Sequence, residues 1–510
     1  MRIRFWAAAT TALASLSLAP AAAQETAADA CGALHGLELA NLASIEAAAV
    51  ARGPFQLPAT PGTEAGPTNL PAHCRVRGVI EPAIRFEVWL PQEATWNGRF
   101  QAVGGGGFAG VISYSAMARA LQDGYATAST DTGHVAPDVE WLGDPGLLRD
   151  YGYRAIYEMT AKAKAAINAY YGRPADYDYF NGCSTGGRQG LMEAQRFPGD
   201  YDGIVSGAPV NHFVATHYTQ LWVALATKEA SDEAILSQAD LDFVSAAAVA
   251  QCDATDGVAD GVIENPMTCD FDPAALQCAG TATTQCLRED QVTAVRKIYA
   301  GPTDPRTGER LNPGLARGGE SSWTVVTDSG LVPIPLEYFT RSVFKDPNWN
   351  WRTFDFGAAP ELASRMTAEV LDATDPDLSA LRNRGSKLIV YHGWNDQVIP
   401  PEGTINYYER VEATLAARPN RKNEQTRDFF RLFMVPGMRH CRGGPGTSEF
   451  DAQNAIEAWV ERGIAPDRIE ASHTENEVVT RTRPLCPYPQ TAQYDGAGDT
   501  NDAANFVCAD

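Results

Sequence analysis

Apolar and polar residues alternate from Cys74 to Leu90, and this pattern predicts two early antiparallel strands. Further along the chain, apolar runs and helical periodicity follow one another. They predict strands at residues 97–103, 125–130, 177–180, 201–205, 387–392 and 429–435, and helices at 153–170, 188–195, 406–416 and 450–461. Strands that alternate with helices in this way predict an α/β fold.

The regular alternation stops after Pro209 and resumes near residue 378. The residues between hold many prolines, four cysteines and a stretch dense in aromatic side chains. We therefore predict one α/β domain, made of residues 24–209 and 378–510, with a second domain inserted at residues 210–377.

The predicted strand that ends near Phe180 runs into Gly182-Cys183-Ser184-Thr185-Gly186, and a helical pattern follows. Gly-x-Ser-x-Gly between a strand and a helix is the nucleophile elbow of α/β-hydrolases. Its glycines leave room for a strained turn that lifts the serine hydroxyl above the sheet. An ordinary glycine turn is the alternative, so other parts of the chain must support the assignment.

Two later loops supply the partners that such a serine needs. In α/β-hydrolases an acid and then a histidine follow the serine, each after a strand. Asp396 follows the strand predicted to end at His392, and His440 follows the strand predicted to end at Val435. We assign Ser184 as the nucleophile, His440 as general base and then acid, and Asp396 as the residue that orients His440.

Cys183 precedes the proposed nucleophile, and Cys441 follows the proposed base. A disulfide between them would hold the two backbones about 5.5 Å apart at Cα and would clamp serine to histidine; the alternative is that each cysteine pairs elsewhere. For the oxyanion we expect two backbone N–H donors. One is that of Thr185, after the nucleophile, and the other is that of Gly107, in the four-glycine run 104–107, which is otherwise a flexible turn.

Residues 252–264 concentrate carboxylates between turn glycines, and hard oxygen ligands at such spacing suit calcium. The glycine lies one place too early for an EF-hand loop. Candidate ligands are the side chains of Asp253, Asp256 and Asp260 and the backbone carbonyls of Val258 and Val262. An acidic solvated turn is the alternative. We expect a structural ion, since the loop is far in sequence from the triad, and the proposed reaction needs no organic cofactor.

The first residues indicate that the protein is exported. A basic start followed by an apolar run to about Leu18, with Ala21-Ala22-Ala23 as a cleavage site, predicts a signal peptide at residues 1–23. The run is too short to span a bilayer, which speaks against the alternative of a membrane anchor. No other stretch is apolar enough to cross a membrane, so we expect a soluble mature protein that is periplasmic or secreted.

Composition agrees with export. The chain has 510 residues and ten cysteines, and an even number of cysteines in an exported protein favours disulfides, whereas no cysteine or histidine pattern indicates zinc. A formal net charge of −22 repels nucleic acid and anionic membranes.

Taken together, these motifs resemble the tannase and feruloyl esterase family over nearly all of the mature chain. The stretches that carry the resemblance are 182–187, 391–396 (Tyr-His-Gly-Trp-Asn-Asp), 436–446 (Pro-Gly-Met-Arg-His-Cys-Arg-Gly-Gly-Pro-Gly), the acidic run at 253–264, and 481–489. The resemblance implies an α/β-hydrolase core, an inserted lid that carries a calcium ion, and esters of aromatic acids as substrates. It also implies five disulfides: Cys31–Cys74, Cys183–Cys441, Cys252–Cys269, Cys278–Cys286 and Cys486–Cys508.

The leading hypothesis is therefore a secreted serine esterase that cleaves feruloyl, other hydroxycinnamoyl or galloyl esters through an acyl-enzyme. One alternative is a hydrolase of mono(2-hydroxyethyl) terephthalate, for which Arg341 could grip the free carboxylate. Another is a calcium-bound binding protein without activity, although the intact Ser, Asp and His speak against it. The aromatic residues of the insertion either form its own core or contact substrate; they are Trp222, Trp323, Tyr338, Phe339, Phe344, Trp349 and Trp351. The sequence leaves the leaving alcohol and the oligomeric state open.

Overall fold

A computed structural model describes residues 29–58, 67–228, 233–279, 285–324, 333–418 and 425–510. The predicted signal peptide at 1–23 lies outside these residues. Among the helices of the described ranges, none combines the length and the apolar character that crossing a bilayer requires.

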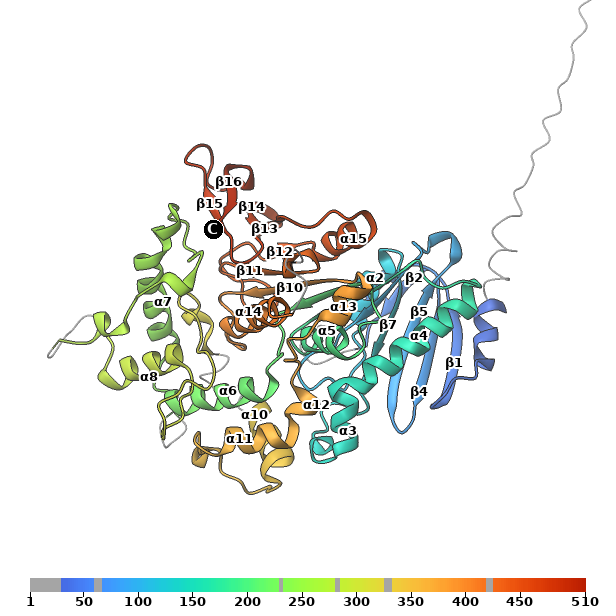
Figure 1. Ribbon diagram of the computed structural model, residues 1–510, viewed down its shortest axis with the longest axis horizontal. Helices are drawn as coiled ribbons and strands as arrows, with labels where there is room; N and C mark the ends of the chain where they lie inside the picture. The colour runs from blue at the N-terminus through green and yellow to red at the C-terminus, as the bar shows by residue number, and fades with distance from the viewer. Residues whose placement is uncertain (1–28, 59–66, 229–232, 280–284, 325–332, 419–424) are drawn as a thin grey trace, which may run out of the picture.

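A nine-stranded sheet forms the centre of the described chain (Figure 1). Its strand order is β1-β4-β5-β7-β6-β8-β9-β10-β11. The strands from β7 onward in this order run parallel, whereas β1, β4 and β5 pair antiparallel and β5 joins β7 antiparallel. The strands are β1 (Leu42–Val50), β4 (His73–Ile80), β5 (Ile84–Pro91), β6 (Arg99–Val103), β7 (Ala126–Thr130), β8 (Tyr177–Cys183), β9 (Gly203–Gly207), β10 (Lys387–Gly393) and β11 (Phe430–Val435).

Helices cover both faces of this sheet, because the parallel strands are apolar on both sides. One face packs on α4 (Ala155–Tyr171), α5 (Thr185–Arg196), α13 (Ser379–Arg384) and α14 (Glu402–Ala416). The opposite face packs on α2 (Tyr114–Gln122) and α15 (Ala452–Arg462). The α/β fold predicted from the alternation is confirmed, with most predicted elements within a few residues of their expected bounds. The strand expected at 201–205 lies at 203–207 instead.

The strand order places a switch point beside β8. The chain passes from β6 through α2 to β7, and then α4 carries it back across β6 to β8. Connections therefore leave the adjacent ends of β6 and β8 in opposite directions. Such a point opens a crevice at the carboxyl ends of the strands, where ligands bind in open α/β sheets.

Between β9 and β10 the described chain is largely helical. Before α13, its described α-helices are α6 (Phe213–Thr227), α7 (Gln238–Cys252), α8 (Glu289–Ala300), α10 (Pro333–Glu337), α11 (Ala359–Ala363) and α12 (Glu369–Leu371). The two ends of this inserted segment meet: the N–H of Ala373 donates to the carbonyl of Asn211 at 2.7 Å, and the N–H of Val214 donates to Oδ1 of Asp372 at 3.0 Å. We call this contact the stem. The domain bounds at 210 and 377 stay predictions.

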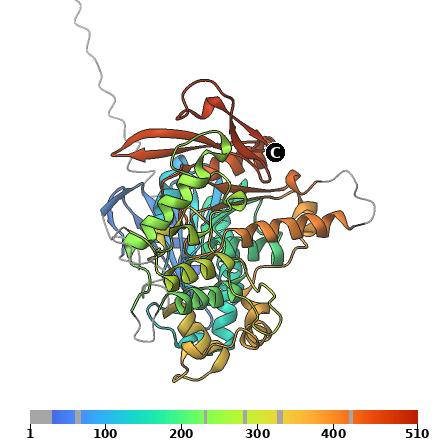
Figure 2. The same cartoon turned by 90° about the vertical axis from the view of Figure 1, so that its left-hand side faces the viewer.

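Smaller strand pairs complete the chain. β2 (Gly53–Gln56) pairs with β3 (Pro67–Leu70) near the N-terminus. Near the C-terminus, β12 (Glu449–Phe450), β13 (Ile469–Glu475) and β14 (Val478–Leu485) form one sheet, and β15 (Thr491–Tyr494) pairs with β16 (Phe506–Ala509). The red C-terminal strands lie beside the green inserted segment in both views (Figures 1 and 2), and Val258 of that segment packs on Ala492 and Phe506.

Candidate active site

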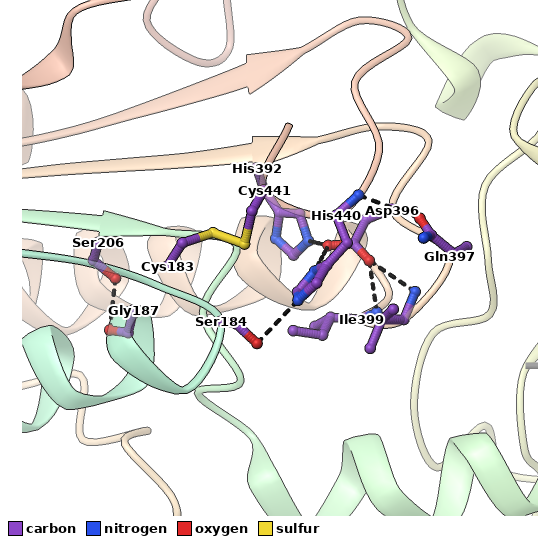
Figure 3. The surroundings of a disulfide bond; sticks show 11 residues. Cys183, Ser184, Gly187, Ser206, His392, Asp396, Gln397, Ile399, His440 and Cys441 are labelled. Atoms are coloured by element: carbon purple, nitrogen blue, oxygen red, sulfur yellow. Dashed lines mark hydrogen bonds and ion pairs between the residues drawn. A yellow bond between two sulfur atoms is a disulfide. The ribbon is translucent and has the colours of Figure 1, made fainter. Parts of the chain in front are cut away.

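Ser184, His440 and Asp396 form one hydrogen-bonded chain (Figure 3). Oγ of Ser184 lies 2.9 Å from Nε2 of His440, and Nδ1 of His440 lies 2.7 Å from Oδ2 of Asp396. The three residues follow β8, β11 and β10, whose carboxyl ends meet at one edge of the sheet. The fold thus brings together side chains that the sequence separates by up to 256 positions.

The turn at Ser184 explains the glycines around it. Ser184 has a φ of 63°, in a region that side chains rarely adopt. A Cβ on Gly182 would lie 2.7 Å from the carbonyl carbon of Gly186, and one on Gly187 would lie 2.2 Å from the carbonyl oxygen of Gly207. Larger residues at Gly182 and Gly187 would collide with backbone, so the elbow keeps its strained serine only with glycine there.

Burial and neighbouring charges shift the pKa values of Asp396 and His440 in opposite directions. Burial alone would raise the pKa of Asp396, but His440 and His392 outweigh it and the pKa lies below its ordinary range. Burial lowers the pKa of His440, but the neighbouring Asp396 outweighs that effect and the pKa is raised. The backbone N–H groups of Val398 and Ile399 donate to Oδ1 of Asp396 at 2.8 and 2.9 Å, which further favours the carboxylate.

A second histidine joins this chain, and the sequence analysis did not predict it. Nε2 of His392 lies 3.0 Å from the same Asp396 oxygen that His440 contacts, and Nδ1 of His392 lies 2.7 Å from Oγ1 of Thr404 (Figure 3 shows the histidine pair). The side chains of His392 and Asp396 are fully buried. The signal was a histidine inside a strand of an otherwise apolar parallel sheet, four residues before the acid.

Cys183 and Cys441 are bonded, with Cα atoms 6.1 Å apart, close to the expected separation. The bond joins the residue before Ser184 to the residue after His440 (Figure 3). The other pairs are also those that the family resemblance implied: Cys31–Cys74, Cys252–Cys269, Cys278–Cys286 and Cys486–Cys508.

The two residues proposed to supply the oxyanion donors are in contact. Oγ1 of Thr185 donates to the carbonyl of Gly107 at 2.6 Å, and Gly107 adopts a φ of 55°. Gly104 and Gly105, earlier in the same loop, pack on the nucleophile helix: the N–H of Gly105 donates to Oε1 of Gln189 at 2.9 Å, and a Cβ on Gly104 would lie 2.5 Å from Cα of Gly186. This packing seats the glycine run beside the serine turn.

The acidic loop, residues 252–264, is held mainly by its own hydrogen bonds. The carboxylate of Asp253 accepts the N–H groups of Asp260, Gly261 and Val262. Arg483 of β14 pairs with Asp260 and ties the loop to the C-terminal strands.

Three observations bear on whether this loop could hold calcium. Within the described residues, no three His, Cys, Asp or Glu side chains stand arranged as a metal site. The donor chemistry nevertheless fits, because the carbonyl oxygens of Val258 and Val262 accept no hydrogen bond from the described residues, although both residues are buried. Burial first and then the charges of Asp260 and Asp253 raise the pKa of Asp256, so the carboxylates crowd one another. A divalent cation would relieve that repulsion.

This acidic loop lies nearer to the triad than its sequence distance suggested. A Cβ on Gly437, in the turn that carries the catalytic histidine, would lie 3.1 Å from Cγ1 of Val262. A Cβ on Gly318 would lie 3.0 Å from Cδ1 of Ile263, and the Gly318 carbonyl accepts Nδ2 of Asn395, beside the catalytic acid, at 2.8 Å. The loop therefore supports both turns from outside.

The residues of the insertion that could bind substrate make contacts within the protein itself. Arg341 forms ion pairs with Glu140 at 2.5 Å and with Glu337 at 2.6 Å. Six of the seven aromatic residues belong to one apolar cluster, which also includes residues outside the insertion, and Trp323 is buried in another. The six are Trp222, Tyr338, Phe339, Phe344, Trp349 and Trp351. The first cluster reaches the site, because Phe108, beside Gly107, packs against it.

Comparisons with known proteins agree with this geometry. The chain matches the family model "Tannase and feruloyl esterase" over residues 69–509. It is 41% identical to an uncharacterized esterase of Xanthomonas campestris pv. campestris, over 94% of this chain and 91% of that protein. It is 36% identical to the mono(2-hydroxyethyl) terephthalate hydrolase of Piscinibacter sakaiensis, over 88% of this chain and 87% of that protein.

A solved structure extends the likeness to three dimensions. The crystal structure of feruloyl esterase B from Aspergillus oryzae superposes with a TM-score of 0.86 at 27% identity, covering 95% of this chain and all of that one. The family model matches most of the chain, and the relatives are similar over nearly their whole length, so the family can be assigned. The protein belongs to the tannase and feruloyl esterase family and is a carboxylic ester hydrolase.

Proposed function

We propose that this protein is a serine esterase that hydrolyses esters of aromatic acids, feruloyl and other hydroxycinnamoyl esters or galloyl esters, through an acyl-enzyme. The observation that carries the proposal is the hydrogen-bonded chain from Ser184 through His440 to Asp396. A histidine with a raised pKa beside a buried carboxylate accepts the serine proton and stabilises the imidazolium that results.

The reaction proceeds in two halves. Oγ of Ser184 attacks the ester carbonyl while Nε2 of His440 takes its proton, and His440 then gives that proton to the departing alcohol. Water, deprotonated by His440, attacks the acyl-enzyme in the same way and frees the acid. The backbone N–H groups of Thr185 and Gly107 stabilise the oxyanion, a role worth about 10²–10³ in turnover per donor.

The surroundings of the site favour an aromatic acyl group. Phe108, after Gly107, and Val398, after the catalytic acid, are partly buried and pack against the aromatic cluster of the insertion. An aromatic ring packed against these side chains would bury apolar surface. The family assignment and the likeness to a feruloyl esterase structure support the same substrate class.

A rival substrate is mono(2-hydroxyethyl) terephthalate, favoured by the 36% identity to a hydrolase of that ester. The ion pairs of Arg341 with Glu140 and Glu337 leave it poorly placed to bind a free carboxylate. Turnover on methyl ferulate, methyl gallate and the terephthalate monoester, measured with one enzyme preparation, separates the two. We expect kcat/KM on one of the first two to exceed that on the third at least tenfold.

Labelling tests the mechanism separately from the substrate. A serine-directed phosphonate should add once to the wild type, at Ser184, and not to Ser184→Ala. Failure to label a folded wild type that cleaves no ester would instead favour the calcium-bound binding protein without activity.

Calcium in the acidic loop belongs to the same proposal. The side chains of Asp253, Asp256 and Asp260 and the carbonyls of Val258 and Val262 would hold it, and it would stabilise the loop without taking part in the reaction. The family resemblance and the crowded carboxylates support this. The five disulfides support residence in an oxidising place, the periplasm or the outside.

A further inference from the structure

The carboxylate of Asp396 serves two histidines at once. Its Oδ2 atom lies 2.7 Å from Nδ1 of His440 and 3.0 Å from Nε2 of His392. Its Oδ1 atom accepts two backbone N–H groups. All four contacts need a hydrogen-bond acceptor on the aspartate side, so only the ionised carboxylate satisfies them together.

The protonation of His392 follows from its partners. Because Oδ2 of Asp396 is a pure acceptor, Nε2 of His392 must carry a proton. Oγ1 of Thr404, 2.7 Å away, can donate to Nδ1, which makes His392 a neutral ring with one fixed tautomer. During the reaction His440 becomes protonated and is stabilised by the charge of Asp396. If His392 were doubly protonated as well, two buried positive charges would share this single carboxylate.

We propose that His392 is a positioning residue for the esterase reaction: as a neutral donor, fixed by Thr404, it holds Asp396 in the orientation that serves His440. The inference rests on the proposed serine mechanism. His392 does not touch the reacting atoms: its ring contacts Asp396, whereas His440 contacts both Asp396 and Ser184 (Figure 3). The His392 side chain is fully buried, and its two ring nitrogens contact Asp396 and Thr404.

The main test replaces His392 with Met, which removes the donor and keeps much of the volume. We expect kcat to fall about 10- to 100-fold with KM little changed, the range set by loss of one hydrogen bond to a charged group. With one donor fewer, the negative charge of Asp396 acts more strongly on His440, so the acid limb of the kcat/KM profile should move to higher pH. Phosphonate labelling of Ser184 should slow by a similar factor.

Three further variants separate positioning from simple loss of structure. His392→Gln keeps a donor near the Nε2 position and should recover most of the lost turnover. Thr404→Val removes the hydroxyl that fixes the tautomer and should shift the acid limb in the same direction, with a smaller loss of turnover. His73→Met removes another buried histidine, on β4, and should alter stability but not the pH profile.

The outcomes are distinct. A folded His392→Met protein with wild-type kcat and an unmoved acid limb overturns the proposal, and so does equal impairment of the Gln and Met variants. If His392→Met does not fold, the Thr404→Val profile decides alone, and an unmoved limb overturns the proposal. An inactive wild type that resists phosphonate would instead overturn the serine mechanism itself.

Discussion

The disulfide between Cys183 and Cys441 allows a quantitative prediction. Replacing both cysteines with serine removes a crosslink that closes a sequence separation of 258 residues. In the chain-entropy model such a loop contributes about 5.5 kcal/mol to the free energy of unfolding. A matched control removes Cys278–Cys286, whose separation is only 8 residues and whose expected contribution is about 2.5 kcal/mol.

The two variants should differ more in kcat than in stability. The crosslink joins the immediate neighbours of Ser184 and His440, whose reacting atoms lie 2.9 Å apart. A displacement of about 1 Å between such groups costs about 100-fold in rate. We therefore expect kcat of the Cys183→Ser, Cys441→Ser protein to fall about 100-fold, with KM changed little because substrate contacts remain.

Urea unfolding and steady-state hydrolysis of one aromatic ester measure the two effects on the same samples. The control variant should lose about half as much stability and keep its kcat. The reasoning is refuted if the Cys183→Ser, Cys441→Ser protein is folded and turns over like the wild type, or if the control loses kcat equally.

Other predictions concern pH, metal and charge. Glu193 is buried on α5 without a hydrogen-bond partner among the described residues, and burial raises its pKa well above 4.5. The folded state then binds the proton more tightly, so stability should fall as pH rises above about 4.5, and Glu193→Gln should unfold at higher urea than the wild type at pH 8 but not at pH 4.5. Because the pKa of His440 is raised above 6.5, kcat/KM should decline below a midpoint higher than that value, measured as a pH–rate profile. A calcium chelator should lower the melting temperature of the wild type by several degrees and that of Asp253→Asn much less, as differential scanning fluorimetry would show. Arg341→Ala should change hydrolysis of the terephthalate monoester less than threefold, since its ion pairs already occupy the guanidinium.

Much of the fold and the site's composition could be predicted because the signals are local. The elbow at Ser184 is a pentapeptide between a strand and a helix, and the strands after it are short apolar runs that place Asp396 and His440 at loop starts. His392 was missed although it stands in the motif with Asp396. Its partners, the carboxylate of Asp396 and the hydroxyl of Thr404, become its neighbours only once β10 and α14 have packed together.

Other parts needed tertiary contacts. The alanines of β1 favour a helix by propensity, yet they pair with β4, as Ala47 does with Val76, because the sheet edge supplies the hydrogen bonds. Val262 and Gly437 are far apart in the chain, and no sequence pattern predicted that they approach each other.

The stem has a practical meaning for engineering. Because the inserted segment enters and leaves at one point, where Asn211 meets Ala373, a chimera needs only two splice sites a few ångströms from each other. The insertion of a relative with another preference could be transplanted there as a cassette, while the sheet and its three reacting side chains stay in place. The segment between Asn211 and Ala373 can thus be exchanged as one unit without cutting any of the strands that precede the three reacting side chains.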